Sequence, residues 1–219
     1  MSDADSSDPT KPGDGIPDKY QRTVTYTVQN GTWNEDAIGF FTKKGTDLVR
    51  VYNLYARPEN GNRAMEESQL TKLNPTLEKI PESTASTGYR GGSWSGTTPT
   101  AETLVTADVT YTCSYTGYYT TEVSYYKLNS DGTYEEWEGK EAVSAKHDLD
   151  QGYTCDSPVG TLSEGDDTYV LYKVEGDLTS AIMPAGTQPG DTIEIKAVYA
   201  KASSADESGN PVPDYLPQP

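Results

Sequence analysis

Two carboxylates near the start of the chain have the spacing of residues that bind calcium. In the stretch GDGIPDKYQ, Asp14 and Asp18 flank a glycine and an isoleucine, as at the end of acidic calcium loops. Ca²⁺ takes about six to eight oxygen ligands. A complete loop would take two of them from positions that hold Thr10 and Pro12 here. The residues therefore favour a turn and a proline-stiffened hinge leading into the first strand. Weak Ca²⁺ binding by Asp14 and Asp18 is the alternative, and no other cofactor is predicted.

Few side chains suit catalysis. His147 is the only histidine, so a metal site built from several histidines is excluded. Catalysis through this residue would have to use Asp148 and Cys155, in a segment with the composition of a polar connection. The sequence contains no nucleophile elbow, HExxH pair, phosphate loop or dinucleotide fingerprint. We therefore predict no catalytic residues and a non-enzymatic protein.

The two cysteines could pair in an oxidising compartment or stay free. Cys113 alternates with polar residues and shares a strand face with Tyr111 and Tyr115, so its side chain should point into a core. A buried thiol behaves as a small hydrophobic group and needs no partner. We predict that both thiols are free, that Cys113 is buried and that Cys155 is more accessible.

Aromatic side chains are the remaining candidates for ligand contact, because sugar rings stack on them. Trp94 and Trp137 could form such a surface, and so could the adjacent pair Tyr118 and Tyr119. The same residues also fit core or cross-strand positions, since most aromatic residues here alternate with polar ones. Tyr118 and Tyr119 stand where two predicted modules join, and there they could hold one module to the next.

The charge of the chain limits its partners. With 17 basic and 34 acidic residues the net charge is −17, and the basic residues are scattered. A field of this sign repels nucleic-acid phosphates and anionic lipid headgroups. No apolar run approaches the roughly 20 residues that a membrane-spanning helix needs. We expect no nucleic acid, no membrane insertion and a monomer.

Tyrosine and threonine alternate along much of the chain, which predicts a mostly β fold. The sequence holds 17 tyrosines against 2 phenylalanines. Residues 22–33 place Val24, Tyr26 and Val28 on one strand face and then reach Asn30-Gly31, a hairpin turn signal. Residues 108–115 repeat the alternation, so the closing strand of this series also has one apolar face.

A second series of strands follows residues 116–120. Its predicted strands lie at 122–128, 168–174 and 191–201, and a turn is predicted at Asn129 to Gly132. One short helix could form within 64–73. The two series predict two small tandem modules in an elongated arrangement.

The composition of the ends completes the predicted organisation. Both flanks are rich in Ser, Asp, Pro and Gly, and the N-terminal one lacks the apolar stretch of a signal peptide, which favours a piece of a longer, modular protein. The predicted parts are a polar linker with a degenerate calcium-loop-like end at 1–18, a first module at 19–116 with an insertion near 35–75, a second module at 117–201, and a proline-rich linker at 202–219.

Several segments resemble repeats of Gram-positive surface proteins. VTYTVQNGTW, LEKIPE, TGYRGGSW and TPTAETLVTADVTYTCSYT resemble the β-grasp-like Listeria–Bacteroides repeats that occur with internalin B-repeats. EVSYYKLNSDGTYEEWEG and the final IEIKAVYAK are similar to mucin-binding-protein (MucBP) repeats. The segment 35–75 departs from the first pattern. The resemblance implies two β-grasp-like modules in an extracellular, cell-wall-linked protein.

These observations favour a non-enzymatic segment of a bacterial cell-surface protein, acting as a stalk or spacer or as a low-affinity adhesion module. The alternative is a carbohydrate- or mucin-binding module whose partners are host glycans or mucin. An accessory domain of a secreted enzyme is a second alternative. A binder should have a solvent-exposed aromatic groove, whereas a spacer should have an elongated outline and small, charged surfaces.

Overall fold

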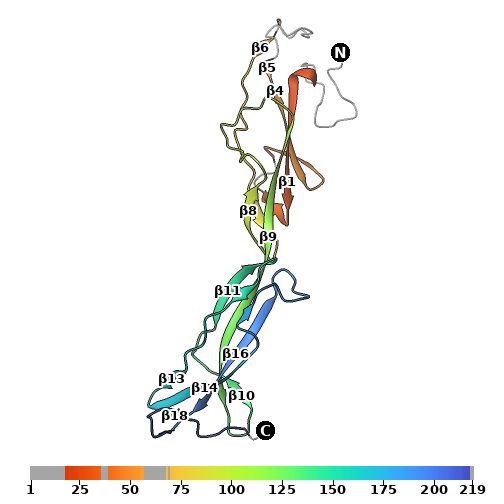
Figure 1. Cartoon of the computed structure of the whole chain (residues 1–219). Helices are drawn as coiled ribbons and strands as arrows, with labels where there is room; N and C mark the ends of the chain where they lie inside the picture. The colour runs from red at the N-terminus through yellow and green to blue at the C-terminus, as the bar shows by residue number, and fades with distance from the viewer. Residues whose placement is uncertain (1–17, 36–38, 57–67, 69, 218–219) are drawn as a thin grey trace. The chain divides into compact units, whose positions relative to one another are not determined.

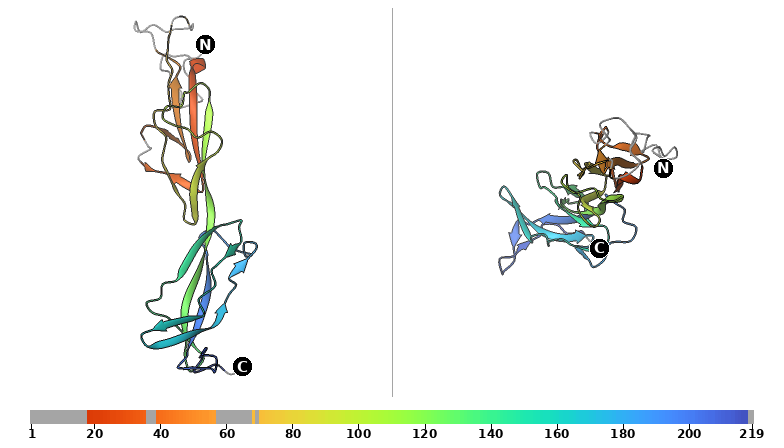
Figure 2. Two further views of the ribbon diagram at one scale, coloured as in Figure 1. Left: turned by 60° about the vertical axis from the view of Figure 1, so that its left-hand side comes forward. Right: turned by 90° about the horizontal axis from the view of Figure 1, so that it is seen from above.

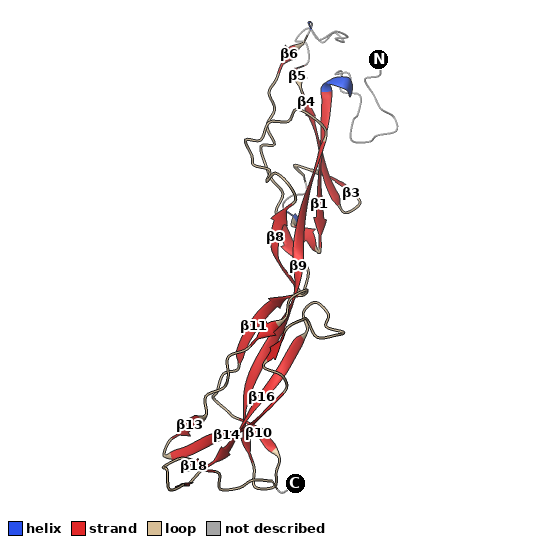
Figure 3. Cartoon of the chain, in the orientation of Figure 1, coloured by secondary structure: helices blue, strands red, loops and turns tan. Residues whose placement is uncertain are grey.

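The computed structural model describes residues 18–35, 39–56, 68 and 70–217, and these residues form a mostly β fold (Figure 3). This prediction is confirmed. The one named helical element in the described ranges is η1, a 3-10 turn at Asp18–Tyr20. The short helix expected within 64–73 falls largely outside the described residues, and Thr71–Lys72 near its end form a strand. The linker expected at 1–18 also lies outside them, except for Asp18.

Contacts divide the chain into two compact units, Met1–Thr116 and Gly117–Pro219, at the position where the sequence places the change of module. One strand, β9 (Val109–Leu128), contributes residues to both. The other strands of the first unit are β1 (Gln21–Gln29), β2 (Gly31–Trp33), β3 (Thr42–Lys44), β4 (Asp47–Asn53), β5 (Tyr55–Ala56), β6 (Thr71–Lys72), β7 (Ser83–Ala85) and β8 (Tyr89–Trp94). Those of the second are β10 (Tyr134–Glu136), β11 (Val143–Asp148), β12 (Tyr153–Thr154), β13 (Thr161–Glu164), β14 (Asp167–Glu175), β15 (Thr179–Ser180), β16 (Thr192–Lys201), β17 (Ser204–Ala205) and β18 (Pro211–Val212).

The main sheet of the first unit places its first and last strands next to each other. The order is β3-β4-β1-β9, and β8 also pairs with β9. β1 is antiparallel to β4 and parallel to β9, with a register from Val24↔Val109 to Gln29↔Ser114. The two parallel strands lie side by side in Figure 1. The chain therefore runs in the same direction along the first strand and the last strand of this unit.

The second unit repeats this scheme with different strands. Its order is β13-β14-β16-β9, and β10 and β11 also pair with β9. In this sheet β9 is the first strand and β16 the last, before the separate β17–β18 hairpin, and the two are parallel from Thr192↔Thr120 to Tyr199↔Lys127 (Figure 2). Both units thus have a parallel pair of terminal strands. The β-grasp assignment itself stays a prediction.

The alternation of residue types accounts for the buried face of the first unit. Val24 and Tyr26 on β1 are fully buried, while the threonines between them belong to the other face. The ring of Tyr26 lies edge-on to Phe41 at 5.3 Å and stacks on Tyr111 at 5.6 Å between centroids. The buried core of this unit is Val24, Tyr26, Phe41, Leu48, Tyr52, Leu77 and Val105.

The second core follows the same rule. Odd-numbered residues of β9 and β16 face it, among them Tyr119, Ile195 and Tyr199, none of which is exposed. Trp137, which follows β10, completes it, with its ring 4.7 Å from that of Tyr169. The buried core of this unit is Tyr119, Val123, Trp137, Tyr153, Tyr169, Ile195, Ala197 and Tyr199.

The Asn30-Gly31 turn signal does not produce the expected hairpin. The residues after it form β2, which pairs with β7 (Gly31↔Ala85 to Trp33↔Ser83) and not with β1. Asn30 does adopt the left-handed backbone that such a turn needs, with φ of 59°, and its side-chain amide donates to the carbonyl of Tyr115. The chain changes sheets at this point, where Gly31 lies against the backbone oxygen of Thr84 and the Tyr115 ring. The turn predicted at Asn129 to Gly132, in contrast, does connect an antiparallel hairpin between β9 and β10.

The linker predicted at 202–219 differs from the structure over residues 202–217. β17 and β18 form a small hairpin there, with Ser204 paired to Val212. Asp214 closes it, since its backbone N–H donates to the carbonyl of Lys201 and its carboxylate accepts from both the backbone N–H and the hydroxyl of Ser203. Composition alone missed this hairpin because the hydrogen bonds of Asp214, and not an apolar core, hold it in place.

Candidate functional site

Two of the four aromatic residues proposed for ligand contact are core residues. Tyr119 is fully buried, and its hydroxyl donates to the carbonyl of Gln151 at 2.7 Å. Trp137 is 2 % exposed, and its indole N–H donates to the Glu164 carboxylate at 3.1 Å. A ring enclosed in this way cannot stack on a sugar. The ligand-contact hypothesis is therefore wrong for these two residues.

Trp94 and Tyr118 are half-buried and remain partly accessible. Trp94 stacks on Trp33, with centroids 6.3 Å apart, and its other neighbours form a shallow open hollow with a carboxylate and a hydroxyl in its wall. That hollow is lined by Ile80, Pro81, Glu82, Ser83, Gly92, Trp94, Cys113 and Tyr115. Tyr118 has the ammonium of Lys146 over its ring at 4.5 Å. Only Trp94 is thus placed beside a hollow.

One wall of this hollow is the ring of Tyr115, which lies between Gly31 and Gly92. A side-chain carbon on Gly31 would lie 2.7 Å from one edge of the Tyr115 ring, and one on Gly92 would lie 2.5 Å from the other edge. The hydroxyl of Tyr115 lies 2.8 Å from that of Ser83. Glycine at both positions is required by this close approach, so Tyr115 is fixed and the hollow has a preformed wall.

The face of the second sheet opposite the core carries a cluster that the sequence did not reveal. Val198 is the register partner of both Tyr126 and Lys173, so all three lie in one cross-strand row. Lys196 lies 5.1 Å from the ring centroid of Tyr126, and Lys173 lies 5.1 Å from that of Tyr134. We name this cluster the tyrosine–lysine face; it consists of Tyr126, Tyr134, Tyr172, Lys173, Glu175 and Lys196.

Charged groups on the tyrosine–lysine face are already paired. The ammonium of Lys173 donates to Glu175 at 2.8 Å, which raises the pKa of the lysine and lowers that of the carboxyl. A lysine over an aromatic ring is attracted by the negative face of the ring. The ring faces are therefore covered by the chain's own lysines. Alternation along β9 could have placed Tyr126 here, but Tyr134 and Tyr172 required the strand pairing.

The calcium and histidine hypotheses find no site in the described residues. Asp14 lies outside the described ranges, and Asp18 begins η1. No group of three or more His, Cys, Asp or Glu side chains that could hold a metal occurs among residues 18–35, 39–56, 68 and 70–217. The Nε2 atom of His147 lies 2.8 Å from the hydroxyl of buried Thr121, at a cross-strand position. His147 thus has a structural contact in the sheet.

The two cysteines have the burial that alternation predicts. Cys113 is 6 % exposed, and Cys155 is half-buried. In a thiol titration without reductant, we expect Cys155 to react in the native protein and both thiols to react after denaturation, because only Cys113 is shielded by the core. Titration of no thiols in denaturant would show a disulfide and contradict the prediction.

Buried tyrosines predict alkaline unfolding. Burial raises the pKa of Tyr52 and that of Tyr199 to about 12, from 10.0, and each hydroxyl donates to a backbone carbonyl. Between about pH 10 and pH 12 these tyrosines ionise in the unfolded chain but stay protonated in the folded one. Their contribution to the free energy of unfolding is therefore fully present below about pH 10 and falls as the pH rises toward 12. Urea midpoints measured from pH 8 to 11.5 should decrease above pH 10. Tyr199→Phe should reduce the decrease in the second unit, and a flat profile would contradict this account.

The terminal strand pairs are the most regular structural feature of both units. In the first unit Gln21 stands eight residues before Gln29, whose partner Ser114 stands two residues before Thr116. The chain therefore enters the first unit at Gln21 and leaves it at Thr116, ten residues further along the direction of the strands. At the usual rise per strand residue this is about 33 Å. In the second unit Gly117 stands three residues before Thr120, whose register partner is Thr192. Lys201, where the chain leaves β16, stands nine residues after Thr192. These twelve steps correspond to about 40 Å.

Comparison with known proteins adds no family to this description: no family model matches the chain, and no curated protein is significantly similar to it. The function therefore has to be inferred from the geometry of the Trp94 hollow, the tyrosine–lysine face and the terminal strand pairs. In the described part of the chain, no helix is long and apolar enough to span a membrane.

Proposed function

We propose that the chain is a non-enzymatic segment of a bacterial cell-surface protein and that it acts as a spacer. The observation that carries the proposal is the parallel pairing of the first and last strands of the main sheet in both units. A chain that enters a unit at one end and leaves it at the other gains the length of the unit each time. Antiparallel terminal strands would instead return the chain to its starting end.

The surface of the second unit supports this proposal. Residues 117–219 contain 19 acidic residues and 6 lysines, and five of these lysines lie over aromatic rings. Because 19 acidic residues stand against 6 lysines, most of the acidic groups are uncompensated. Such a surface repels acidic glycans and other acidic proteins, which suits a segment that separates two sites. The resemblance to Gram-positive surface repeats agrees with an extracellular, cell-wall-linked location.

A second candidate function is binding of a neutral sugar at the Trp94 hollow. This candidate rests on a half-buried indole beside Glu82 and Ser83, since one aromatic face with a few polar groups is typical of sugar sites. The hollow is shallow and open, so only low affinity is expected from it.

Binding of the full chain to immobilised neutral glycans and to mucin separates the two functions. A spacer predicts no saturable binding, and the same result for Trp94→Ala. Saturable binding that Trp94→Ala abolishes would contradict the spacer and support the sugar site. Leu104→Ala, which removes a 58 % exposed side chain from the same unit, is the control.

A further inference from the structure

The direction in which a spacer is pulled determines how its terminal strands are loaded. This step rests on the proposed function, in which one end of the chain is anchored and the other carries a ligand under tension. In each unit, tension on the two ends pulls the parallel terminal strands along their length in opposite directions. The interstrand hydrogen bonds then have to break together, because each carries part of the load at the same time.

The first pair is reinforced by side chains. β1 and β9 share six register partners. In addition, the hydroxyl of Thr27 lies 2.8 Å from that of Thr112, and the hydroxyl of Ser114 donates to the Gln29 amide oxygen at 3.0 Å. The carboxylate of Asp108, next to β9, accepts from the backbone N–H of Thr23 at 2.7 Å. These bonds join β1 to β9 and its flank from end to end, and all are loaded in the same direction.

The second pair is longer and more deeply buried. β9 and β16 share eight register partners, and Ile195, Ala197, Val198 and Tyr199 on β16 are fully buried. Water that would compete for the interstrand bonds is therefore excluded from both faces of β16 between Ala197 and Ala200.

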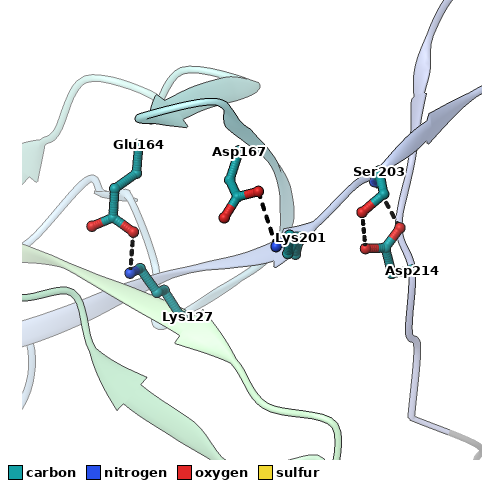
Figure 4. A network of polar contacts seen from close by, with 6 residues as sticks. All are labelled: Lys127, Glu164, Asp167, Lys201, Ser203 and Asp214. Carbon is teal, nitrogen blue, oxygen red and sulfur yellow. Dashed lines mark hydrogen bonds and ion pairs between the residues drawn. The ribbon is translucent and has the colours of Figure 1, made fainter.

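Ion pairs also fix the ends of these two strands. The Lys127 ammonium of β9 lies 2.5 Å from the Glu164 carboxylate of β13, and that of Lys201 on β16 lies 2.9 Å from the Asp167 carboxylate of β14. Figure 4 shows both pairs. The Lys127 ammonium lowers the pKa of the Glu164 carboxyl, so this pair stays charged at neutral pH. The contact between Ser203 and Asp214 in the same view closes the hairpin where the chain leaves β16. Each terminal strand is thus tied to the β13–β14 hairpin.

We propose that these two parallel strand pairs are mechanical clamps, and that the function of the chain includes resistance to tension applied between its ends. β1 and β9 form the clamp of the first unit, and β9 and β16 form that of the second. The resistance is directional, because it comes from strands loaded along their length. Tension that separates the same strands from one end would break their bonds one after another.

Single-molecule force spectroscopy on the full chain tests this proposal. In one arrangement the handles are attached at the two chain ends. In the other, one handle is at the C-terminus and one at Ser130, an exposed residue of the turn after β9. Ser130 and the end of β16 lie at the same end of the parallel pair, since Tyr199 is the partner of Lys127. The second arrangement therefore peels β16 from β9.

Each unfolding event between the chain ends is expected at a several-fold higher force than the event between Ser130 and the C-terminus. Forced unfolding follows the unfolding barrier and not equilibrium stability, so a domain that is merely stable would not show this dependence on direction. Equal forces in the two arrangements, or a lower force between the chain ends, would overturn the clamp. The glycan and mucin measurement is independent, so loss of the clamp and loss of the spacer function are distinguishable.

Discussion

Replacing Gly152 with alanine is expected to destabilise the second unit by about 3 kcal/mol, at the upper end of the usual cost of overpacking. The added carbon would overlap the backbone carbonyl oxygen of Ser180 and lie 2.6 Å from the carbonyl carbon of Ala181. Neither atom belongs to a flexible side chain. The overlap can be relieved only if β12 and β15, which pair Tyr153 with Ser180, move apart.

Calorimetric melting of the full chain measures this effect. Gly152→Ala should lower the transition of the second unit and leave that of the first in place. Gly160→Ala is the matched control in the same unit, because a carbon added there meets nothing within 4 Å. Similar melting of Gly152→Ala and Gly160→Ala would contradict the close approach of the two segments.

Replacing Trp137 with alanine should cost about 3–5 kcal/mol, the range for truncation of a buried large aromatic side chain. The indole is 2 % exposed and contacts the rings of Tyr169 and Tyr199, at 4.7 Å and 5.7 Å between centroids. Its loss would also leave Glu164 without the indole N–H and remove the ring beneath Lys127. Both a cavity and lost polar contacts contribute.

Urea unfolding followed by far-ultraviolet circular dichroism checks the Trp137 prediction. Trp94→Ala serves as the comparison, since it removes the same side chain from a half-buried position and should cost less. Glu164→Gln makes no cavity: it keeps the indole and an acceptor for it while removing the charge opposite Lys127, so its cost measures the ion pair alone. A Trp137→Ala protein as stable as Trp94→Ala would show that Trp137 is not a core residue.

Local alternation predicted the longer strands and their buried faces: β1, β14 and β16 lie where it placed them, and β9 joins two segments predicted as separate strands. Val24 and Tyr26 are buried as expected, and the turn at Asn129 to Gly132 lies where the sequence placed it. These features depend on neighbours within a few residues, so the sequence reports them directly. Adjacency in the sequence grouped Tyr118 and Tyr119 as one pair, yet adjacent strand residues point to opposite faces, and only Tyr119 is fully buried.

Features that depend on distant residues could not be predicted in the same way. The partner of Val24 is Val109, and nothing in the local pattern of either strand specifies a parallel pairing across such a separation. Trp137 stands among acidic residues, which favours an exposed position, yet Glu164 and Lys127 from other strands enclose it. The change of sheet after Asn30 likewise involves a distant partner, since Gly31 pairs with Ala85. The candidate site, built on the terminal strand pairs, belongs to this group.

The distance between spin labels at Lys19→Cys and Thr116→Cys tests the account most directly, because it reports whether the chain crosses the first unit from end to end. Both positions are exposed; Cys155→Ser removes the accessible native thiol, and Cys113 is buried. Parallel terminal strands predict a distance of about 35 Å by pulsed electron resonance, from the rise per residue along β1 and β9. A distance of about 10 Å would place the two ends at the same end of the sheet, as antiparallel neighbours would be, and would contradict both the spacer and the clamp.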